Sequence, residues 1–384
     1  MLSRTDLRRG GRSVWTPPSW IEGDERQSRF ARHPPFLAVF FFQAIHFLSG
    51  SPFFLQRGVQ VNGRKIILCE CESRRKALAV LAAVLLDACF GDPPSRFHPV
   101  AWMGSWIGVL RRRAPKRGPL TELLYGAAGI GVSATVLWVV GRWVAGLLQR
   151  WRLGWLVEGA VLSQLIAWRG LMRAGAEVAG ALERGDLGEA RRQLGWHLVS
   201  RDVSALDGGL VAAATIESLA ENSSDSVIAP LFWYGIGGLP AALAYRFVNT
   251  ADAMLGYRDA ELEWIGKSAA RVDDLVNLVP ARLTALLIVA GAAMGGGNGG
   301  SAWRIWRRDG GKTASPNAGQ PMSAAAGALE VELEKVGHYR LGEGLRKPGA
   351  GDIRRAGRLL SICVFVGIAS GAAASLLFWE RRDA

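Results

Sequence analysis

Acidic and amide side chains recur at helical spacing in this 384-residue sequence. Glu217 and Glu221 stand four residues apart, and Asn222 and Asp225 follow directly. Residues at this spacing share one face of a helix, where two like charges destabilise it. A divalent metal ion with its nucleotide phosphates, or an arginine, would balance the two carboxylates. The segment therefore predicts a cation site.

Two later segments repeat this pattern. Asn249 and Asp252 are three residues apart, with Arg246 three residues before Asn249, and residues 273–277 place two aspartates about one turn before an asparagine. Proteins hold hard cations with such oxygen ligands, completed by phosphates and water. Interhelical hydrogen bonding in a bundle is the alternative. The predicted metal ligands are Glu217, Glu221, Asn222, Asp225, Asp252, Asp273, Asp274 and Asn277.

A further group of ionisable side chains lies at the end of an apolar run. Asp87, Asp92, Arg96 and His98 fall within residues 87–98, where three prolines end the predicted helix. Ionisable groups near membrane depth are costly and tend to be functional. An ordinary polar interfacial loop explains the group equally well.

The composition indicates which kind of chain must position these groups. Hydrophobic residues make up 49% and charged residues 21%, with a net charge of +13. Soluble proteins carry about 25% charged residues, so this chain is comparatively apolar. Four cysteines are too few for a disulfide framework. Because no nucleic-acid-binding motif accompanies the basic charge, we predict no nucleic-acid partner.

Several apolar stretches approach the roughly 20 residues that a helix needs to cross a bilayer. Pro230 and Pro240 would kink or break one of them. We predict an all-α, multi-pass helical membrane protein with about four or five spans, in which polar inter-span helices form the site. The stretches are residues 77–90, 123–141, 155–168, 226–245, 283–297 and 359–379.

Three regions are expected along the chain. Residues 1–76 predict a basic, poorly structured N-terminal extension, or a segment upstream of the true start. Residues 77–344 hold every polar cluster and predict the catalytic membrane domain. Residues 345–384 predict a basic linker and a final membrane helix.

Taken in order, these motifs resemble the adenosylcobinamide-phosphate synthases of the CobD/CbiB type. The likeness covers about residues 78–344, and one departure is Gln-Pro-Met at residues 320–322, where the family usually has Trp-Pro-Glu. The matching motifs are Gly-Asp-Pro-Pro at 91–94, His-Pro-Val at 98–100, Ser-Arg-Asp at 200–202, Glu-Ser-Leu-Ala-Glu-Asn at 217–222, Ala-Pro-Leu-Phe at 229–232, Asn-Thr at 249–250, Gly-Tyr at 256–257, Pro-Ala-Arg at 280–282 and Ser-Pro-Asn-Ala-Gly at 315–319.

The resemblance implies a reaction in cobalamin biosynthesis. It implies that (R)-1-aminopropan-2-ol or its O-phosphate is joined by an amide bond to the free propionate of adenosylcobyric acid, with ATP and Mg²⁺. The implied partners are the corrinoid, the amine, membrane lipid and soluble enzymes of the same pathway. The implied location is the inner cell membrane, with a site that faces the cytoplasm because corrinoid and ATP are cytosolic.

The same chemistry distributes roles among the candidate residues. Asp92 or His98 is the predicted base for the ammonium nucleophile, and Glu217, Glu221 and Asp273 complete the catalytic set. Cationic and polar side chains are expected on phosphates or the corrin periphery. These are Arg201, Arg246, Lys267, Arg271, Arg282, Asn249, Tyr257, Ser315 and Asn317.

Two other functions use the same features. A transporter would employ intramembrane acids as a proton or substrate relay, and a non-catalytic scaffold would recruit soluble corrinoid enzymes to the membrane. Against transport, the polar clusters lie in long segments between the predicted spans.

Overall fold

The structure is a computed structural model that describes residues 67–256 and 262–380. All described residues belong to one unit of the chain. The extension predicted at residues 1–76 lies outside the described residues as far as residue 66, whereas residues 67–76 belong to the first described helix. The prediction for Tyr257 also lies outside the described residues.

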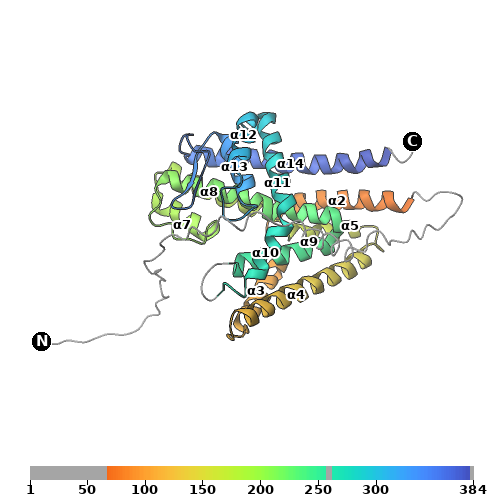
Figure 1. Ribbon diagram of the computed structural model, residues 1–384. Helices are drawn as coiled ribbons and strands as arrows, with labels where there is room; N and C mark the ends of the chain where they lie inside the picture. The colour runs from red at the N-terminus through yellow and green to blue at the C-terminus, as the bar shows by residue number, and fades with distance from the viewer. Residues whose placement is uncertain (1–66, 257–261, 381–384) are drawn as a thin grey trace. The chain divides into compact units, whose positions relative to one another are not determined.

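Helices dominate the described chain (Figure 1). Their order begins with α2 (Ile67–Phe90), the short η2 (Ser95–Phe97), α3 (Pro99–Arg112), α4 (Pro119–Leu148), α5 (Gly154–Ser163), α6 (Trp168–Glu183), α7 (Leu187–His197) and α8 (Gly208–Ser223). It continues with η3 (Ser224–Ile228), α9 (Ala229–Leu255), α10 (Lys267–Val276), α11 (Leu278–Gly291), η4 (Ala292–Gly296), α12 (Gly299–Asp309), α13 (Gly319–Leu329) and α14 (Ala350–Glu380).

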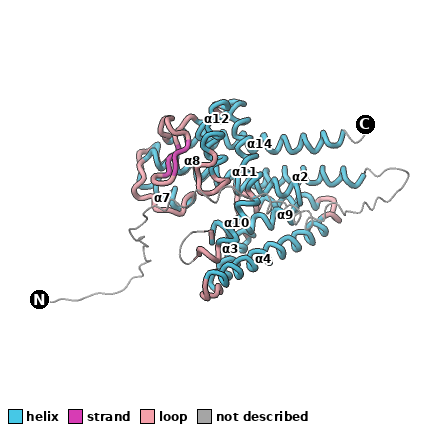
Figure 2. Tube along the Cα trace, viewed as in Figure 1, coloured by secondary structure: helices cyan, strands magenta, loops and turns pink. Residues whose placement is uncertain are grey.

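One small hairpin departs from the predicted all-α fold. Strands β1 (Leu333–Lys335) and β2 (Tyr339–Leu341) pair antiparallel, with Lys335 opposite Tyr339 (Figure 2). The connecting turn contains Gly337 at φ 77°, a conformation that glycine adopts without steric cost. The pair is short, and the sequence analysis did not anticipate it.

Three helical stretches in the described part of the chain are long and apolar enough to cross a membrane. They are Pro119–Leu148, Gly208–Leu255 and Leu278–Gly296, and each contains one of the predicted apolar runs. The predicted run at 155–168 instead gives α5, which has only 10 residues. The runs at 77–90 and 359–379 lie in α2 and α14. The mainly helical, membrane-type fold is confirmed, and the number of four or five spans stays a prediction.

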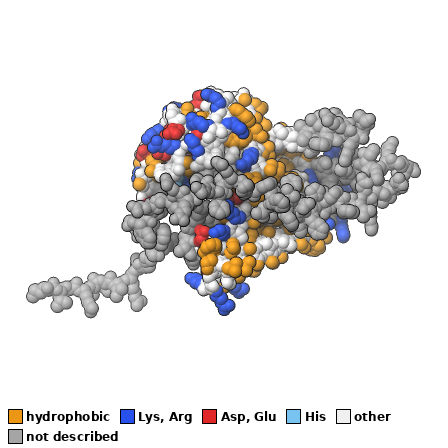
Figure 3. Space-filling view, viewed as in Figure 1, with side chains coloured by type: hydrophobic (Ala, Val, Ile, Leu, Met, Phe, Trp, Pro, Cys, Tyr) orange, Lys and Arg blue, Asp and Glu red, His pale blue; other side chains and the backbone are white. Residues whose placement is uncertain are grey.

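Helix α4 packs one narrow face on α9 and leaves the opposite face open. Gly126 and Gly141 lie on the packed face, where a Cβ at Gly126 would come 2.1 Å from the carbonyl oxygen of Ile265. A Cβ at Gly141 would come 2.8 Å from the Cα of Pro240. Small residues thus let the helix backbones approach closely. Figure 3 shows hydrophobic side chains over the α4 side, whereas charged side chains gather around α7 and α12.

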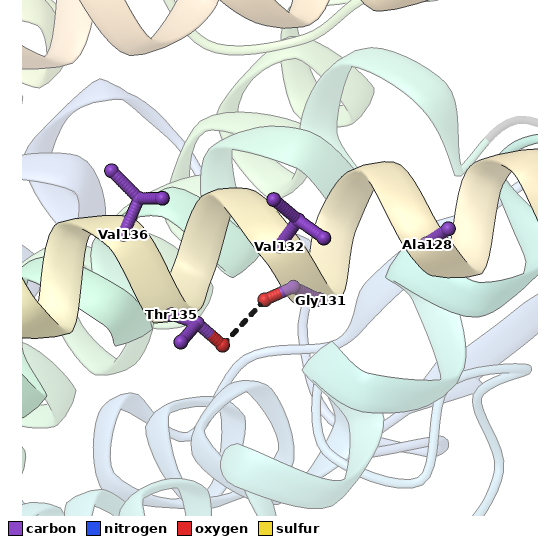
Figure 4. Close-up of a pocket in the computed structure, with 5 residues that line it drawn as sticks. All are labelled: Ala128, Gly131, Val132, Thr135 and Val136. Atoms are coloured by element: carbon purple, nitrogen blue, oxygen red, sulfur yellow. Dashed lines mark hydrogen bonds between the residues drawn. The ribbon is translucent and has the colours of Figure 1, made fainter.

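A shallow hollow of about 400 Å³ lies on the open face of α4 (Figure 4). Ala128, Gly131, Val132, Thr135 and Val136 line it, and the Thr135 hydroxyl donates to the Gly131 carbonyl at 2.8 Å. These side chains carry no charge and their only polar group is satisfied within the helix. The hollow is therefore suited to contact lipid chains.

The long helical segment Gly208–Leu255 is irregular at two places. A π-helical turn, η3, separates α8 from α9, and Gly238 has φ 66° and ψ −160° just before Pro240. Pro240 cannot donate a backbone hydrogen bond, so the predicted kink occurs there. Pro230 lies in the first turn of α9, where a missing N–H costs nothing.

Two hydrophobic clusters flank this segment. One draws on α6, α7, α8 and α11 to α14, and the other on α2, α3, α9 and α10. Leu231, near the start of α9, packs against both. The segment therefore passes from one cluster to the other, and its polar side chains lie along that junction.

A buried carboxylate fixes the hairpin region to α12. Asp309 is fully buried, and its oxygens accept from Arg308 and Lys312 at 2.8 Å and from the Gly342 N–H at 2.7 Å. Although burial alone would raise the pKa of Asp309, these hydrogen bonds hold it at about 2. Gly342 follows β2 directly, so this ion cluster fixes one end of the hairpin.

The same glycine-to-alanine substitution should have different effects on stability at two positions of α4. Gly126→Ala should destabilise the protein by about 1–3 kcal/mol, because the new methyl group meets the Ile265 backbone. Gly131→Ala is the matched control, since nothing lies within 4 Å of its Cβ position. Thermal unfolding in detergent measures both. Equal melting temperatures for the two variants would contradict the close packing of α4.

Candidate functional site

Asp273 is the central polar residue of the α9–α10 junction. Its Oδ1 accepts from the Asn249 amide at 3.3 Å, and its Oδ2 accepts from the Asn277 amide at 3.0 Å. Asp273 is 8% exposed and Asn277 is 1% exposed. Because buried carboxylates need hydrogen-bond donors, these amides explain how the acid is accommodated. These contacts match the alternative of hydrogen bonding between helices, and the cation site stays a prediction.

The π-helical turn brings α8 to the same place. Tyr245 lies with its hydroxyl 2.9 Å from the Asp225 carbonyl and 2.9 Å from Asn277 Oδ1. Arg246 donates through Nη1 to Ser226 at 3.1 Å and to Asn249 at 3.2 Å. A π-helical turn shifts the register of the following side chains, and such turns are frequent at functional sites. Here η3 carries Asp225 to the face shared with Arg246.

Arg246 is the cation at the centre of this group. Its guanidinium lies within electrostatic range of Asp225, Asp273 and Asp92. Its Nε is buried and has no hydrogen-bond partner among the described residues. The structure shows no close ion pair of Arg246 with any described carboxylate. A buried donor without a partner is costly, so this side chain is suited to bind an incoming anion.

A second polar group extends from α10 to α13. Ser315 donates to Asp274 Oδ1 at 3.3 Å, and the Asn317 amide donates to the Asp274 carbonyl at 2.6 Å. Arg282 donates to Asn317 Oδ1 at 3.3 Å. The segment at 315–317 is thus held against α10 by several bonds. The structure brings these four predicted residues together.

A third group lies between α8 and the hairpin. Glu217 is 6% exposed, and Arg201 lies 4.0 Å from its Oε2. Its Oε1 has no partner in the described part of the chain. Tyr339 from β2 and Lys335 from β1 lie within electrostatic range of Glu217 and Glu221. Burial raises the pKa of Tyr339, as do the nearby glutamates, so its hydroxyl remains a donor.

The three groups form one continuous acidic region. Glu221 interacts electrostatically with Asp252, and Asp252 with Asp274. No three acidic, histidine or cysteine side chains within the described ranges lie close enough to hold a metal ion by themselves. Mg²⁺ commonly takes only one or two carboxylates and completes its shell with phosphate and water. The donor set therefore fits a magnesium ion that arrives with a phosphate ligand.

Asp92 and His98 approach this region from the α2–α3 connection. Their side chains lie 3.4 Å apart, between Asp92 Oδ1 and His98 Nε2. His98 also caps α3, because its Nδ1 accepts from the Val100 N–H at 3.2 Å. With Nδ1 acting as the acceptor, a neutral ring carries its proton on Nε2, facing Asp92. Asp92 is exposed and lies within electrostatic range of Arg246.

Three predicted residues do not join the site through contacts. Lys267 pairs with Glu263 at 3.4 Å and lies 4.1 Å from the centre of the Trp264 ring. Arg271 is exposed. Asn222 donates to the Ser218 carbonyl one turn earlier, at 2.9 Å. Helical periodicity placed these residues near the acids, but local partners engage Lys267 and Asn222.

Sequence reasoning missed several residues that the structure adds. Tyr245 precedes Arg246 and lies one turn before Asn249, a signal that the sequence offered. Ser226 adjoins Asp225 in the same way. Lys335 and Tyr339 depend on the short hairpin, and no helical pattern could reveal them.

The environment of Asp273 has a measurable consequence. Burial and the neighbouring charge of Asp252 raise the pKa of Asp273 to about 7, although the two asparagine hydrogen bonds act in the opposite direction. In metal-free protein, infrared spectra of ¹³C-aspartate-labelled samples should show a carboxyl band that titrates near pH 7. Asp252→Asn removes a like charge, so the midpoint should fall.

Two variants assign that band. Asp273→Asn should abolish it, whereas the exposed Asp202→Asn should leave it unchanged. A wild-type protein in which every aspartate titrates near the ordinary value of about 4 would contradict the burial described here.

Comparison with known proteins gives one consistent group of relatives. The family model described as "CobD/Cbib protein" matches residues 80–360. The chain is 43% identical over 274 residues to the "Cobalamin biosynthesis protein CobD" of Dehalococcoides mccartyi, covering 70% of this chain and 87% of that relative. It is 41% identical over 308 residues to the protein of that name from Photorhabdus laumondii, covering 78% and 95%. No solved structure matches the chain.

Proposed function

Because the chain belongs to the CobD/CbiB family, we propose that it acts in cobalamin biosynthesis as an amide-forming ligase. The substrates are (adenosyl)cobyric acid and (R)-1-aminopropan-2-ol or its O-phosphate, and the product is (adenosyl)cobinamide or its phosphate. The observation that supports this most directly is the acidic region of α8, η3, α9 and α10 around the buried Arg246. A non-catalytic scaffold would not need a buried guanidinium with an unused donor.

The reaction requires an activated carboxylate. A propionate does not condense with an amine at neutral pH, so phosphoryl or adenylyl transfer from ATP must precede attack. Magnesium, when bound, would neutralise the developing phosphate charge. The carboxylates, amides and arginine that gather among the described residues support such a site.

We assign the magnesium–nucleotide role to the acids and amides of the three helices. Glu217, Glu221, Asp225, Asp252, Asp273 and Asp274 supply the carboxylates, and Asn222 and Asn277 supply neutral oxygens. Asn249 holds Asp273 and Arg246 at fixed positions through its two hydrogen bonds. Preorganised charges of this kind stabilise a transition state without reorganising during the reaction.

The cationic and polar residues bind the substrates. Arg246 and Arg201 lie closest to the acids and are assigned to phosphate. Arg282, Ser315 and Asn317 border the Asp274 side of the region. Lys267 and Arg271 remain candidates only for the corrin periphery, because they lie outside the contacts described above. Asp92, with His98 beside it, is the assigned base for the ammonium group.

The packing of α4 suggests which side of the membrane carries the site. Gly126 contacts Ile265 and Gly141 contacts Pro240, so α9 runs antiparallel to α4 and its C-terminal half lies beside the start of α4. That half carries Arg246, Asn249 and Asp252. The α3–α4 connection precedes the start of α4, so it lies at the same end as the site.

The charge of the two connections then favours a cytoplasmic site. The last turn of α3 carries Arg111 and Arg112, and the α3–α4 connection carries Arg113, Lys116 and Arg117, whereas the α4–α5 connection carries Arg150 and Arg152. Basic residues are enriched in cytoplasmic loops. We therefore place the site at the cytoplasmic face of the inner membrane, where corrinoid and ATP are available.

A reconstituted assay tests the proposed reaction. Purified protein in detergent, given adenosylcobyric acid, Mg²⁺, ATP and each amine, should form the amide product, which chromatography detects. Glu221→Ala and Asp273→Ala should each lower the rate by about 10²-fold or more, because each removes charge stabilisation at the reacting groups. Glu177→Gln, at a half-buried acid on α6 that pairs with Arg173, should retain full activity.

Failure of all nucleotide and amine combinations with folded wild-type protein would overturn the ligase assignment. Full activity in both alanine variants would overturn the site assignment instead.

Accessibility labelling tests the orientation. In a background with the four native cysteines replaced by serine, single cysteines at Lys116 and Arg152 are exposed to a membrane-impermeant maleimide in intact cells. Lys116→Cys should be protected and Arg152→Cys labelled, because the first lies on the cytoplasmic side. Reversed labelling would place the site on the outer face.

A further inference from the structure

The end of α2 and the start of α6 are joined by reciprocal hydrogen bonds. The Arg169 guanidinium donates through Nη1 to the carbonyls of Ala88, at 2.8 Å, and of Cys89. In return, Asp87 Oδ2 accepts from the Arg169 backbone N–H at 2.9 Å. An arginine thus satisfies orphan carbonyls at one helix end, and a carboxylate satisfies an orphan N–H at another. We call Asp87 and Arg169 the α2–α6 clamp.

The clamp joins segments that are distant in the sequence. Asp87 is 2% exposed, and its other oxygen, Oδ1, has no hydrogen-bond partner among the described residues. Ala167, the capping residue of α6, makes no side-chain hydrogen bond of its own. Asp87, which belongs to α2, therefore caps the N-terminus of α6. Among the described residues this buried carboxylate makes one hydrogen bond, which indicates that the relative position of α2 and α6 matters.

The chain after the clamp folds closely against α6. Gly91 has φ 66°, and a Cβ there would lie 3.1 Å from Cδ of Arg169. A Cβ on Gly170 would lie 3.2 Å from Asp92 Oδ2. Glycine at both positions permits this approach. Asp92 is consequently held against the first turn of α6, beside the clamp.

Asp92 then links the clamp to the site. Its Oδ1 lies 3.4 Å from His98 Nε2, and its charge interacts with Arg246 of α9. A single carboxylate, that of Asp92, therefore connects the clamp residue Arg169 with Arg246. A shift of the α2–α6 junction would move Asp92 away from the acidic region, although the helices that carry the region itself would stay in place.

We propose that Arg169 and Asp87 are positioning residues that hold Asp92, and with it His98, in place against the start of α6. The sequence analysis named Asp87 in an ionisable group without giving it a role, and it did not name Arg169. The inference rests on the proposed function, because Asp92 is the base in that reaction. Misplacement of a reacting group by about 1 Å can cost about 10²-fold in rate, so the clamp should act on kcat.

Four variants measured in the reconstituted assay examine the clamp. Arg169→Gln should lower kcat by about 10²-fold with little change in KM, and Arg169→Lys, which keeps one donor, should lose less. Asp87→Asn keeps an oxygen acceptor for the Arg169 N–H and should remain close to wild type. Gly170→Ala leaves the clamp intact but pushes on Asp92, so kcat should fall without loss of melting temperature.

A double-mutant cycle separates positioning from general stabilisation. In an Asp92→Asn background, Arg169→Gln should cause no further loss of kcat, because the group that it positions is already disabled. Arg173→Gln, one turn along α6 and exposed in a pair with Glu177, is the matched control. It should leave kcat unchanged in both backgrounds.

Three results would overturn the inference. The first is an equal loss from Arg169→Gln with and without Asp92, and the second is a loss of melting temperature alone. The third is wild-type activity in Asp92→Asn, which would remove the positioned group while leaving the ligase assignment intact. Failure of the ligase assignment itself has a different signature, the absence of product from folded wild-type protein.

Discussion

The structure depends on the accommodation of carboxylates inside an apolar helical protein. A buried charge without a partner is strongly unfavourable, and this chain buries or half-buries several of them along α8, α9 and α10. Asparagine amides hold Asp273, a serine hydroxyl donates to Asp274, and Arg246 lies within electrostatic range of Asp225. Two buried polar atoms of this region, Glu217 Oε1 and Arg246 Nε, have no hydrogen-bond partner among the described residues.

Irregular backbone brings these carboxylates together. The π-helical turn η3 and the break at Gly238 interrupt what would otherwise be a continuous 48-residue helical segment. A straight helix of that length would extend far beyond a bilayer. The breaks let the segment pass between two hydrophobic clusters, and they direct Asp225 and Arg246 to one place. The same irregularities therefore serve packing and the site.

Residue type and spacing singled out many of the residues that the structure brings together, and their role as a cation site stays a prediction. Asp273 and Asn277 lie one turn apart as their spacing predicts, whereas the contact of Asn249 with Asp273 depends on how α9 packs on α10. The apolar run at 155–168 was misleading, because composition alone does not reveal that α5 ends after 10 residues. Lys267 was equally misleading, since its charge is used locally by Glu263 and Trp264. The spacing of residues along a helix shows which of them share a face, but it does not show which residues of other elements that face contacts.

The sequence by itself determined the helical, membrane-type fold, the family likeness and the acidic and amide residues of the site, because hydropathy and helical period are local properties. Tertiary structure alone decided which helices meet. The proximity of Tyr339 to Glu217, the clamp of Arg169 on α2 and the alignment of α9 with α4 all join residues distant in the chain. Such contacts arise from packing across the core, and no local pattern along the chain encodes them.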